Sequence, residues 1–284
     1  AANVARNVAS LGGQVSILSR VGDDIDGAQL KRLMEESSID TQLLIASNTV
    51  PTITKTRVTS GHHQLLRFDK ELLQPLSQFD EGCIITQLKE VADDFDLIIV
   101  EDYAKGLLTP PLVEALREIC AGGKIVTVDP NSRNPISWRG FTAVKPNLSE
   151  ACTVVQRTVQ FSDELNCLSN KDLKELAAAL MVEWAPSHLL ITLGEHGMLY
   201  LDDDMRLLSL AALTKDIFDL SGAGDTAIAV FSVGLVSGMS GEAAARFSNT
   251  ASSRVVEKSG TASIDASEID DLIEKSTTIT PSEI

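Results

Sequence analysis

The sequence predicts an α/β fold, a three-layer sandwich in which helices cover both faces of a mainly parallel central sheet, with a small β lid. Apolar runs alternate with helical patterns in the second half of the chain, as in DLIIV (96–100), KIVTVD (124–129) and HLLITL (188–193). Runs that are almost continuously apolar are typical of parallel strands covered on both faces. Residues 41–69 change to short strands around a Gly-His-His turn, which predicts a hairpin outside the main sheet.

The first third of the chain supplies the elements that precede this alternation. Residues 1–11 are predicted to form an amphipathic helix, and a Gly-Gly pair ends it before a strand at 14–19. A second helix is expected over 26–37, because its leucines and methionine recur on one face. The hairpin at about 41–69 then has the pattern of a lid.

The remaining elements complete one domain. We expect helices near 110–121, 170–184, 223–238, 241–256 and 266–275, a strand–helix passage through 142–156, and small strands around 198–210. The sequence therefore predicts a single domain over 1–275 and a polar tail over 276–284.

Composition excludes some classes of partner. The chain has 284 residues and a formal net charge of −16, which argues against sequence-independent binding to nucleic acid or to an anionic membrane surface. Its longest weakly charged stretch, 220–241, is interrupted by Gly222, Gly224, Gly234 and Gly238, so we interpret it as a buried helix. The four cysteines are scattered without a C-x-x-C pair, which favours free thiols in a reducing cytoplasm.

The strongest chemical signal is the segment Asp219-Leu-Ser-Gly-Ala-Gly-Asp225-Thr, which precedes an apolar helix. Small residues at Gly222, Ala223 and Gly224 let backbone amides converge where the helix starts, and a helix N-terminus attracts anions. The Asp225 carboxylate suits this place if it takes a proton from a hydroxyl that attacks the bound phosphate. This interpretation predicts a kinase.

Two other interpretations of this segment remain open. Gly222-x-Gly224-x-x-Ala227, with Glu242 downstream, also fits a dinucleotide fingerprint, although Asp225 would then repel the pyrophosphate. A glycine-rich turn with a capping Asp is the purely structural interpretation. The sequence contains no Walker A loop, which excludes a P-loop ATPase.

Four segments resemble the signatures of the ribokinase-like (pfkB) carbohydrate kinases. Residues 219–225 resemble the second signature, D-T-x-G-A-G-D, and Asn3-Val-Ala with its following glycines fits the spacing of the first. Lys-Pro-Asn147-Leu-Ser-Glu150 resembles the N-x-x-E motif, and the run from Thr192 to Gly197 resembles the strand and turn that flank the nucleotide. On these motifs the chain is identified as a member of the family, with a ribokinase-like fold.

The resemblance implies roles for these residues, with ATP and Mg²⁺ as cofactors. Asp225 would be the general base, with the amides of Gly222, Ala223 and Gly224 as an anion hole. The positions implied to bind ATP are Asn147, Thr192, Gly194, Gly197 and Asn249. Asn3 would bind the sugar, and Glu150 with Asn147 would hold Mg²⁺ through water, although a helix-capping pair also explains these two residues.

Within the family, the chain most resembles the heptose 7-phosphate kinases of lipopolysaccharide-core synthesis. The similar segments are 101–109, 51–58 with 64–69, and 247–261, while Glu101 replaces a usual Ser. The resemblance implies ATP-dependent phosphorylation of the anomeric hydroxyl of a heptose 7-phosphate to the 1,7-bisphosphate. The implied substrate-binding residues are Asn3, Lys55, Arg67, Asp69 and Lys105. Alternatives are a kinase of ribose, fructose or a related sugar, and a truncated non-catalytic homologue.

The resemblance also bears on the ends of the fold and on assembly. Family members have an opening strand with a sugar-binding Asp, which this sequence lacks, so we expect an N-terminal strand to be missing. The lid strands are expected to pair across a possible homodimer. Sugar phosphate and ATP are then the expected small-molecule partners, and neither nucleic acid nor a membrane is expected.

Overall fold

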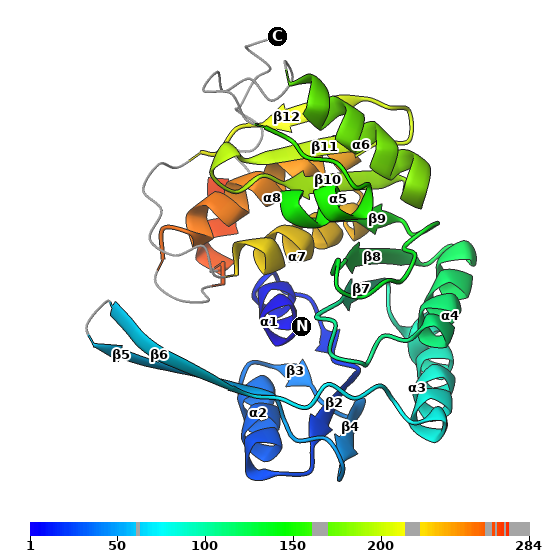
Figure 1. Ribbon diagram of the computed structural model, residues 1–284, viewed down its shortest axis with the longest axis vertical. Helices are drawn as coiled ribbons and strands as arrows, with labels where there is room; N and C mark the ends of the chain where they lie inside the picture. Colours follow the sequence, from blue (N-terminus) through cyan, green and yellow to red (C-terminus); the bar gives the residue numbers. More distant parts are fainter. Residues whose placement is uncertain are drawn as a thin grey trace.

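A six-stranded mixed sheet forms the centre of the molecule, as the computed structural model shows (Figure 1). The structure describes residues 1–60, 63–160, 170–213, 222–258, 263–264, 266–269 and 271–272. In spatial order the strands are β12 (Leu207–Leu210), β11 (Met198–Asp202), β10 (His188–Thr192), β9 (Ala143–Val144), β8 (Ile125–Asp129) and β7 (Leu97–Glu101). Strands β7 to β10 are parallel, and β11 and β12 add an antiparallel edge.

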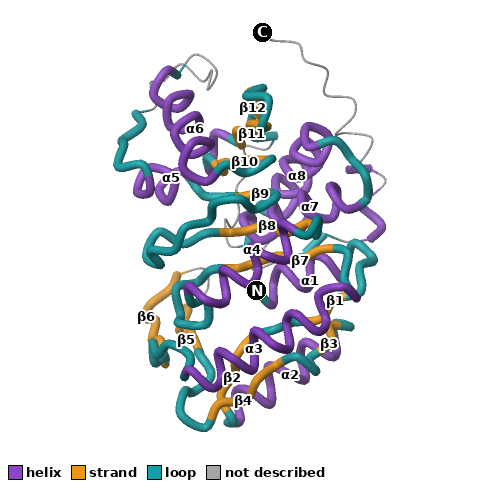
Figure 2. The backbone as a smooth tube through the Cα atoms, turned by 90° about the vertical axis from the view of Figure 1, so that its right-hand side faces the viewer, coloured by secondary structure: helices purple, strands orange, loops and turns teal. Residues whose placement is uncertain are grey.

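Helices cover both faces of this sheet, which confirms the predicted three-layer α/β sandwich (Figure 2). One face packs against α4 (Pro110–Ala121), α5 (Leu148–Val154) and α6 (Lys171–Trp184), with α3 (Gln78–Val91) beside α4. The other face packs against α7 (Ala223–Val236) and α8 (Gly241–Val255), and α1 (Ala2–Ser10) lies against α7. Strand β10 shows the reason, because Leu189 and Ile191 pack into one apolar cluster while Leu190 packs into another with Phe231.

The predicted strand at 14–19 is wrong in its extent, because the chain changes partner within it. Residues Val15–Ser16 form β1, which pairs with β3 (Ile39–Asp40), whereas Ser19–Gly22 form β2, which pairs with β4 (Leu44–Ser47). Helix α2 (Ile25–Glu36) connects the two pairs and agrees with the helix predicted over 26–37. These short pairs form a small lobe below the main sheet (Figure 1).

The lid is an antiparallel hairpin of β5 (Thr54–Ser60) and β6 (His63–Lys70) that projects from this lobe (Figure 1). It starts at Thr54 rather than near residue 41, because β4 pairs with β2 instead. Opposed pairs alternate between its faces: Val58 lies opposite Leu66 and Thr56 opposite Phe68, whereas Lys55 lies opposite Asp69. The hairpin therefore has one apolar face and one charged face.

Several other elements follow the sequence, and one was missed. The helices predicted over 110–121, 170–184, 223–238 and 241–256 agree closely with α4, α6, α7 and α8. Helix α3 was not predicted, although Ser77 caps it by accepting a hydrogen bond from the Asp80 amide. Short 3₁₀ turns occur at η1 (Ala92–Asp94), η2 (Gly194–His196) and η3 (Ala266–Glu268). The rest of the helix predicted over 266–275 falls largely, and the tail from 276 entirely, outside the described residues.

In the described part of the chain, helices that combine the length and the apolar character needed to cross a lipid bilayer are absent.

Candidate active site

Charged residues follow three neighbouring parallel strands, each at the point where the strand ends. Glu101 ends β7, Asp129 ends β8, and Lys145 comes directly after β9. The carboxyl ends of parallel strands meet at one edge of a sheet, which is where open α/β sheets bind ligands. The Lys145 Nζ atom lies 2.9 Å from Oδ2 of Asp129, and the lysine side chain is only 5% exposed. Sequence reasoning assigned no role to these residues, although each charge ends an apolar run.

Asp225 lies at the same edge, in the first turn of α7. Gly222 caps this helix with a φ of 92°, a left-handed conformation that glycine adopts without strain. The side-chain amide of Asn3 donates to Oδ2 of Asp225 at 2.9 Å, and the Tyr103 hydroxyl donates to Oδ1 at 3.4 Å. The structure thus brings together Asn3 and Asp225, two residues that the sequence motifs singled out. The part of the second signature at 219–221 lies outside the described residues.

Asp225 belongs to a cluster of carboxylates. One oxygen each from Glu101, Asp129 and Asp225 lie within 4.8 Å of one another, and Oε1 of Glu101 is buried without a hydrogen-bond partner among the described residues. Burial, followed by the charge of Asp129, raises the pKa of Glu101 well above its usual range. Burial also raises the pKa of Asp129, although Lys145 opposes this effect. Carboxylate oxygens are the ligands that Mg²⁺ prefers, so this cluster fits a divalent cation.

The turn that starts α7 combines two sources of positive potential. A Cβ atom built on Gly224 would lie 3.6 Å from the Lys145 Nζ atom, so the buried ammonium group lies next to the turn. The free amides of a helix N-terminus carry a partial positive charge of their own. Both contributions favour an anion at Gly222, Ala223 and Gly224, and the role of these residues as a phosphate hole stays a prediction.

Asn147 and Glu150 form a capping box at the start of α5. The Glu150 amide donates to Oδ1 of Asn147 at 2.9 Å, and the Asn147 amide donates to Oε2 of Glu150 at 2.9 Å. Asn147 also forms an isolated parallel bridge with Thr192, so these two predicted nucleotide residues are neighbours. Burial raises the pKa of Glu150. The structure therefore shows the capping pair, and the Mg²⁺ role of these two residues stays a prediction.

The other residues predicted to border the nucleotide have structural partners. Gly194 and Gly197 adopt φ values of 62° and 89° around η2, and a Cβ on Gly197 would lie only 2.0 Å from the Leu210 carbonyl oxygen. Asn249 is 5% exposed on α8, and its amide donates to the carbonyl of Ala211 at 2.9 Å. These contacts hold the edge of the sheet together, and contact with adenine stays a prediction for all three.

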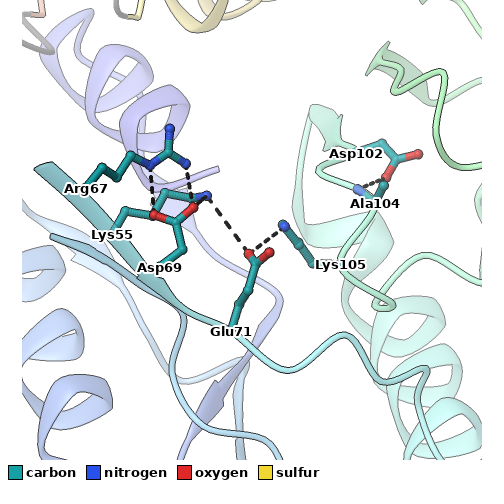
Figure 3. A network of polar contacts seen from close by, with 7 residues as sticks. All are labelled: Lys55, Arg67, Asp69, Glu71, Asp102, Ala104 and Lys105. Carbon is teal, nitrogen blue, oxygen red and sulfur yellow. Dashed lines mark hydrogen bonds and ion pairs between the residues drawn. The ribbon is translucent and has the colours of Figure 1, made fainter. Parts of the chain in front are cut away.

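The predicted substrate cations meet two carboxylates at the base of the lid (Figure 3). Arg67 donates to both oxygens of Asp69, at 2.7 and 2.6 Å, and Lys55 donates to Oδ2 of Asp69 at 3.2 Å. Across from them, Lys105 donates to Oε2 of Glu71 at 2.6 Å. Arg67 holds the pKa of Asp69 down to about 2, and Lys105 lowers the pKa of Glu71.

A turn after β7 connects this cluster to Asp225. Asp102 accepts a hydrogen bond from the amide of Ala104 at 2.7 Å and another from the side chain of Asn134 at 2.9 Å. Gly106 has a φ of 86°, and a Cβ there would lie 2.5 Å from the Gln74 carbonyl oxygen. These contacts fix a segment in which Tyr103 touches Asp225 and Lys105, two residues later, touches Glu71.

The sequence profile of the pfkB family of carbohydrate kinases matches residues 1–269. The chain belongs to this family. Curated relatives include the bifunctional protein HldE of Marinomonas sp. (strain MWYL1), which is 38% identical over 272 residues, with 95% of this chain covered. HldE of Haemophilus influenzae is 33% identical over 274 residues, with 96% of this chain covered. The matches cover 54% and 55% of these relatives, so the chain spans about half their length.

Solved structures show the same fold. Phosphofructokinase-2 from Escherichia coli in complex with potassium has a TM-score of 0.76, at 18% identity, over 97% of this chain and 86% of that one. Arabidopsis thaliana ribokinase complexed with ribose and ATP has a TM-score of 0.74, at 18% identity, over 96% and 86%. The ribokinase-like fold and the family predicted from the motifs are both confirmed. The family to which the chain belongs is one of carbohydrate kinases.

Proposed function

We propose that this kinase phosphorylates the anomeric hydroxyl of a heptose 7-phosphate, with ATP as donor, to give the 1,7-bisphosphate. The observation that carries the proposal is the segment 101–106, in which Tyr103 contacts Asp225 and Lys105 contacts the Glu71 carboxylate at the base of the lid. Lys105 thereby joins Lys55 and Arg67, and these three residues are the lid-base cations. A sugar phosphate offers a hydroxyl to Asp225 and a phosphate to the lid-base cations.

The resemblance of segments 101–109, 51–58 with 64–69, and 247–261 to heptose 7-phosphate kinases favours heptose among the sugars. The curated relatives are bifunctional proteins named HldE. The reaction belongs in the cytoplasm, which supplies ATP.

The proposed reaction uses the residues at the carboxyl edge. Asp225 takes the proton of the anomeric hydroxyl, the sugar oxygen bonds to the γ-phosphorus, and the bond from that phosphorus to the β-phosphate oxygen breaks to release ADP. Asn3 and Tyr103 orient Asp225 through their hydrogen bonds to its two oxygens. The amides of Gly222–Gly224 and the nearby Lys145 ammonium group stabilise charge on the transferred group.

The carboxyl edge also has ligands suited to the divalent cation that accompanies ATP in such kinases. Mg²⁺ neutralises phosphate charge when it is bound. Glu101 and Asp129 would hold it directly, and Asn147 with Glu150 would hold it through water.

Glu150→Gln tests the metal role apart from the capping role. A glutamine keeps an oxygen that accepts from the Asn147 amide but loses the charge, so we expect the Mg²⁺ concentration for half-maximal turnover to rise with little change in melting temperature. Asn170→Ala is the matched control, because Asn170 caps α6 through the Leu173 amide at 3.1 Å, and its loss should cost about 1 kcal/mol of stability. Unchanged Mg²⁺ dependence in Glu150→Gln, with a lower melting temperature in Glu150→Ala, would leave capping as the whole role.

The substrate assignment is tested with a panel of sugars assayed for ADP release. We expect heptose 7-phosphate to have a much higher kcat/KM than free heptose, ribose or fructose, because each free sugar lacks the group that the lid-base cations bind. Product analysis should place the new phosphate on the anomeric oxygen. If ribose or fructose exceeds every sugar phosphate, the heptose assignment fails while the family membership stands.

The apolar face of the lid favours a second copy of this chain as its partner. Val58, Leu66 and Phe68 are 41%, 54% and 51% exposed, and an isolated two-stranded hairpin is marginally stable in water. We therefore propose a homodimer through the lid and expect sedimentation analysis to show a dimer that Phe68→Glu converts to monomer. Leu33→Glu, at a 47% exposed position on α2, is the control. A monomeric unmodified chain would contradict the dimer.

A further inference from the structure

Glu71 lies between the lid hairpin and the segment 101–106, in which Tyr103 contacts Asp225. Its Oε2 atom is 2.6 Å from the Lys105 Nζ atom and 4.0 Å from the Lys55 Nζ atom (Figure 3). Lys55 belongs to the hairpin and Lys105 to the turn after β7, so a single carboxylate oxygen connects the two elements. The side chains of Lys105 and Glu71 are 22% and 27% exposed, so solvent and small anions reach them.

The two carboxylates of this cluster are bound to different degrees. Asp69 receives two hydrogen bonds from Arg67 and a third from Lys55, which gives it a fixed, bidentate partner. Within the described part of the chain, Glu71 makes one close polar contact, to Lys105, through one oxygen. Of the two, Glu71 is therefore the carboxylate that an incoming anion can replace at lower cost.

The charge of the cluster also favours such a replacement. Lys55, Arg67 and Lys105 carry three positive charges, while Asp69 and Glu71 carry two negative ones. A phosphate dianion that takes the place of Glu71 pairs with both lysines and brings one more negative charge than the carboxylate. A neutral sugar hydroxyl offers neither lysine a charge, so it cannot compete with Glu71.

We propose that Glu71 determines specificity by occupying the phosphate subsite between Lys55 and Lys105 until the phosphate of the substrate displaces it. The inference rests on the proposed function, because it assigns the non-reacting end of the same substrate. Tyr103 contacts Asp225 and lies two residues before Lys105, so a sugar whose phosphate binds Lys105 extends toward the base. The close approach of Gly106 to the Gln74 carbonyl keeps Lys105 beside Glu71.

Glu71→Gln in the full chain tests this proposal with inorganic phosphate as the probe. Titration calorimetry is done with Mg²⁺ and a non-hydrolysable ATP analogue present, so that the nucleotide site is filled. We expect phosphate affinity to rise about two- to fivefold, the factor for one partly exposed ion pair that no longer competes. Glu71→Gln combined with Lys105→Met should lose this gain, which localises the effect to Lys105.

The matched control is Glu118→Gln, which breaks an exposed pair with Lys89 at 2.7 Å away from the lid and should leave phosphate affinity unchanged. Equal or weaker phosphate binding in Glu71→Gln would overturn the proposal, because Glu71 would then serve only to hold the lid. If phosphate affinity rises but sugar phosphates are not substrates, the heptose function fails and the anion exchange stands. If sugar phosphates are substrates and phosphate affinity does not rise, the heptose function stands and the anion exchange at Glu71 fails.

Discussion

Asp225→Asn should lower turnover on the order of 10²- to 10⁴-fold, the contribution of a positioned general base. The asparagine keeps an oxygen that accepts one of the hydrogen bonds from Asn3 and Tyr103, so the geometry is largely retained. It cannot take the proton of the sugar hydroxyl. The substitution also removes a negative charge from a cluster that holds Glu101 and Asp129, so ATP affinity should stay the same or improve. Single-turnover kinetics and nucleotide titration measure the two effects separately.

Asp172→Asn is the matched control for this variant, because Asp172 also lies in the first turn of a helix, α6, and belongs to the opposite layer. It should leave turnover unchanged and cost at most a few tenths of a kcal/mol through the helix dipole. Near-normal turnover in Asp225→Asn would refute the base assignment. Simultaneous loss of ATP binding and turnover would mean that Asp225 stabilises the turn before α7 and does not act as the base.

Lys145→Met should destabilise the protein by about 3–5 kcal/mol, the usual cost of breaking a buried ion pair from one side. Burial works against the charged lysine, but the charge and hydrogen bond of Asp129, with the charges of Glu101 and Glu150, together outweigh it and raise the lysine pKa. Without the ammonium group, Asp129 loses its ion-pair partner while Glu101 and Asp225 remain close. Urea denaturation measures this loss, and turnover of the folded fraction should also fall because the turn before α7 loses the cation beside Gly224.

A double-mutant cycle separates the ion pair from simple loss of packing. Lys145→Met with Asp129→Asn removes both charges, so it should recover more than 1 kcal/mol relative to the sum of the single variants. Lys89→Met, which breaks the exposed pair with Glu118, is the control and should cost about 0–1 kcal/mol. Additive losses across the cycle would show that the two side chains do not depend on each other.

The sequence predicted the elements of the fold better than the composition of the site. Alternation of apolar strands and helices was enough for the three layers, because the strand residues are buried on both faces, as at Leu189 and Leu190. The glycine motif located the turn before α7, and the first motif located Asn3. The strand at 14–19 was wrong because hydrophobic pattern does not show where a strand changes partner.

The residues that surround Asp225 could not be predicted because they depend on strand order. Glu101, Asp129 and Lys145 meet only because β7, β8 and β9 are adjacent and parallel, and β9 has just two residues, Ala143 and Val144. Glu71 follows the hairpin directly, but its pairing with Lys105 depends on how the lid lies against the body. A charged residue directly after each apolar run was the available signal.

The hydrogen bond between Asn3 and Asp225 joins residues 222 positions apart, which has a consequence for how activity arises during folding. Closing such a long loop is costly in chain entropy before the contacts inside it form. Contacts of this range slow folding, and proteins of this size commonly pass through intermediates. A partly folded species with an intact central sheet would still lack this contact. Enzyme activity should therefore return only with the last refolding phase, which makes it a sensitive reporter of complete folding.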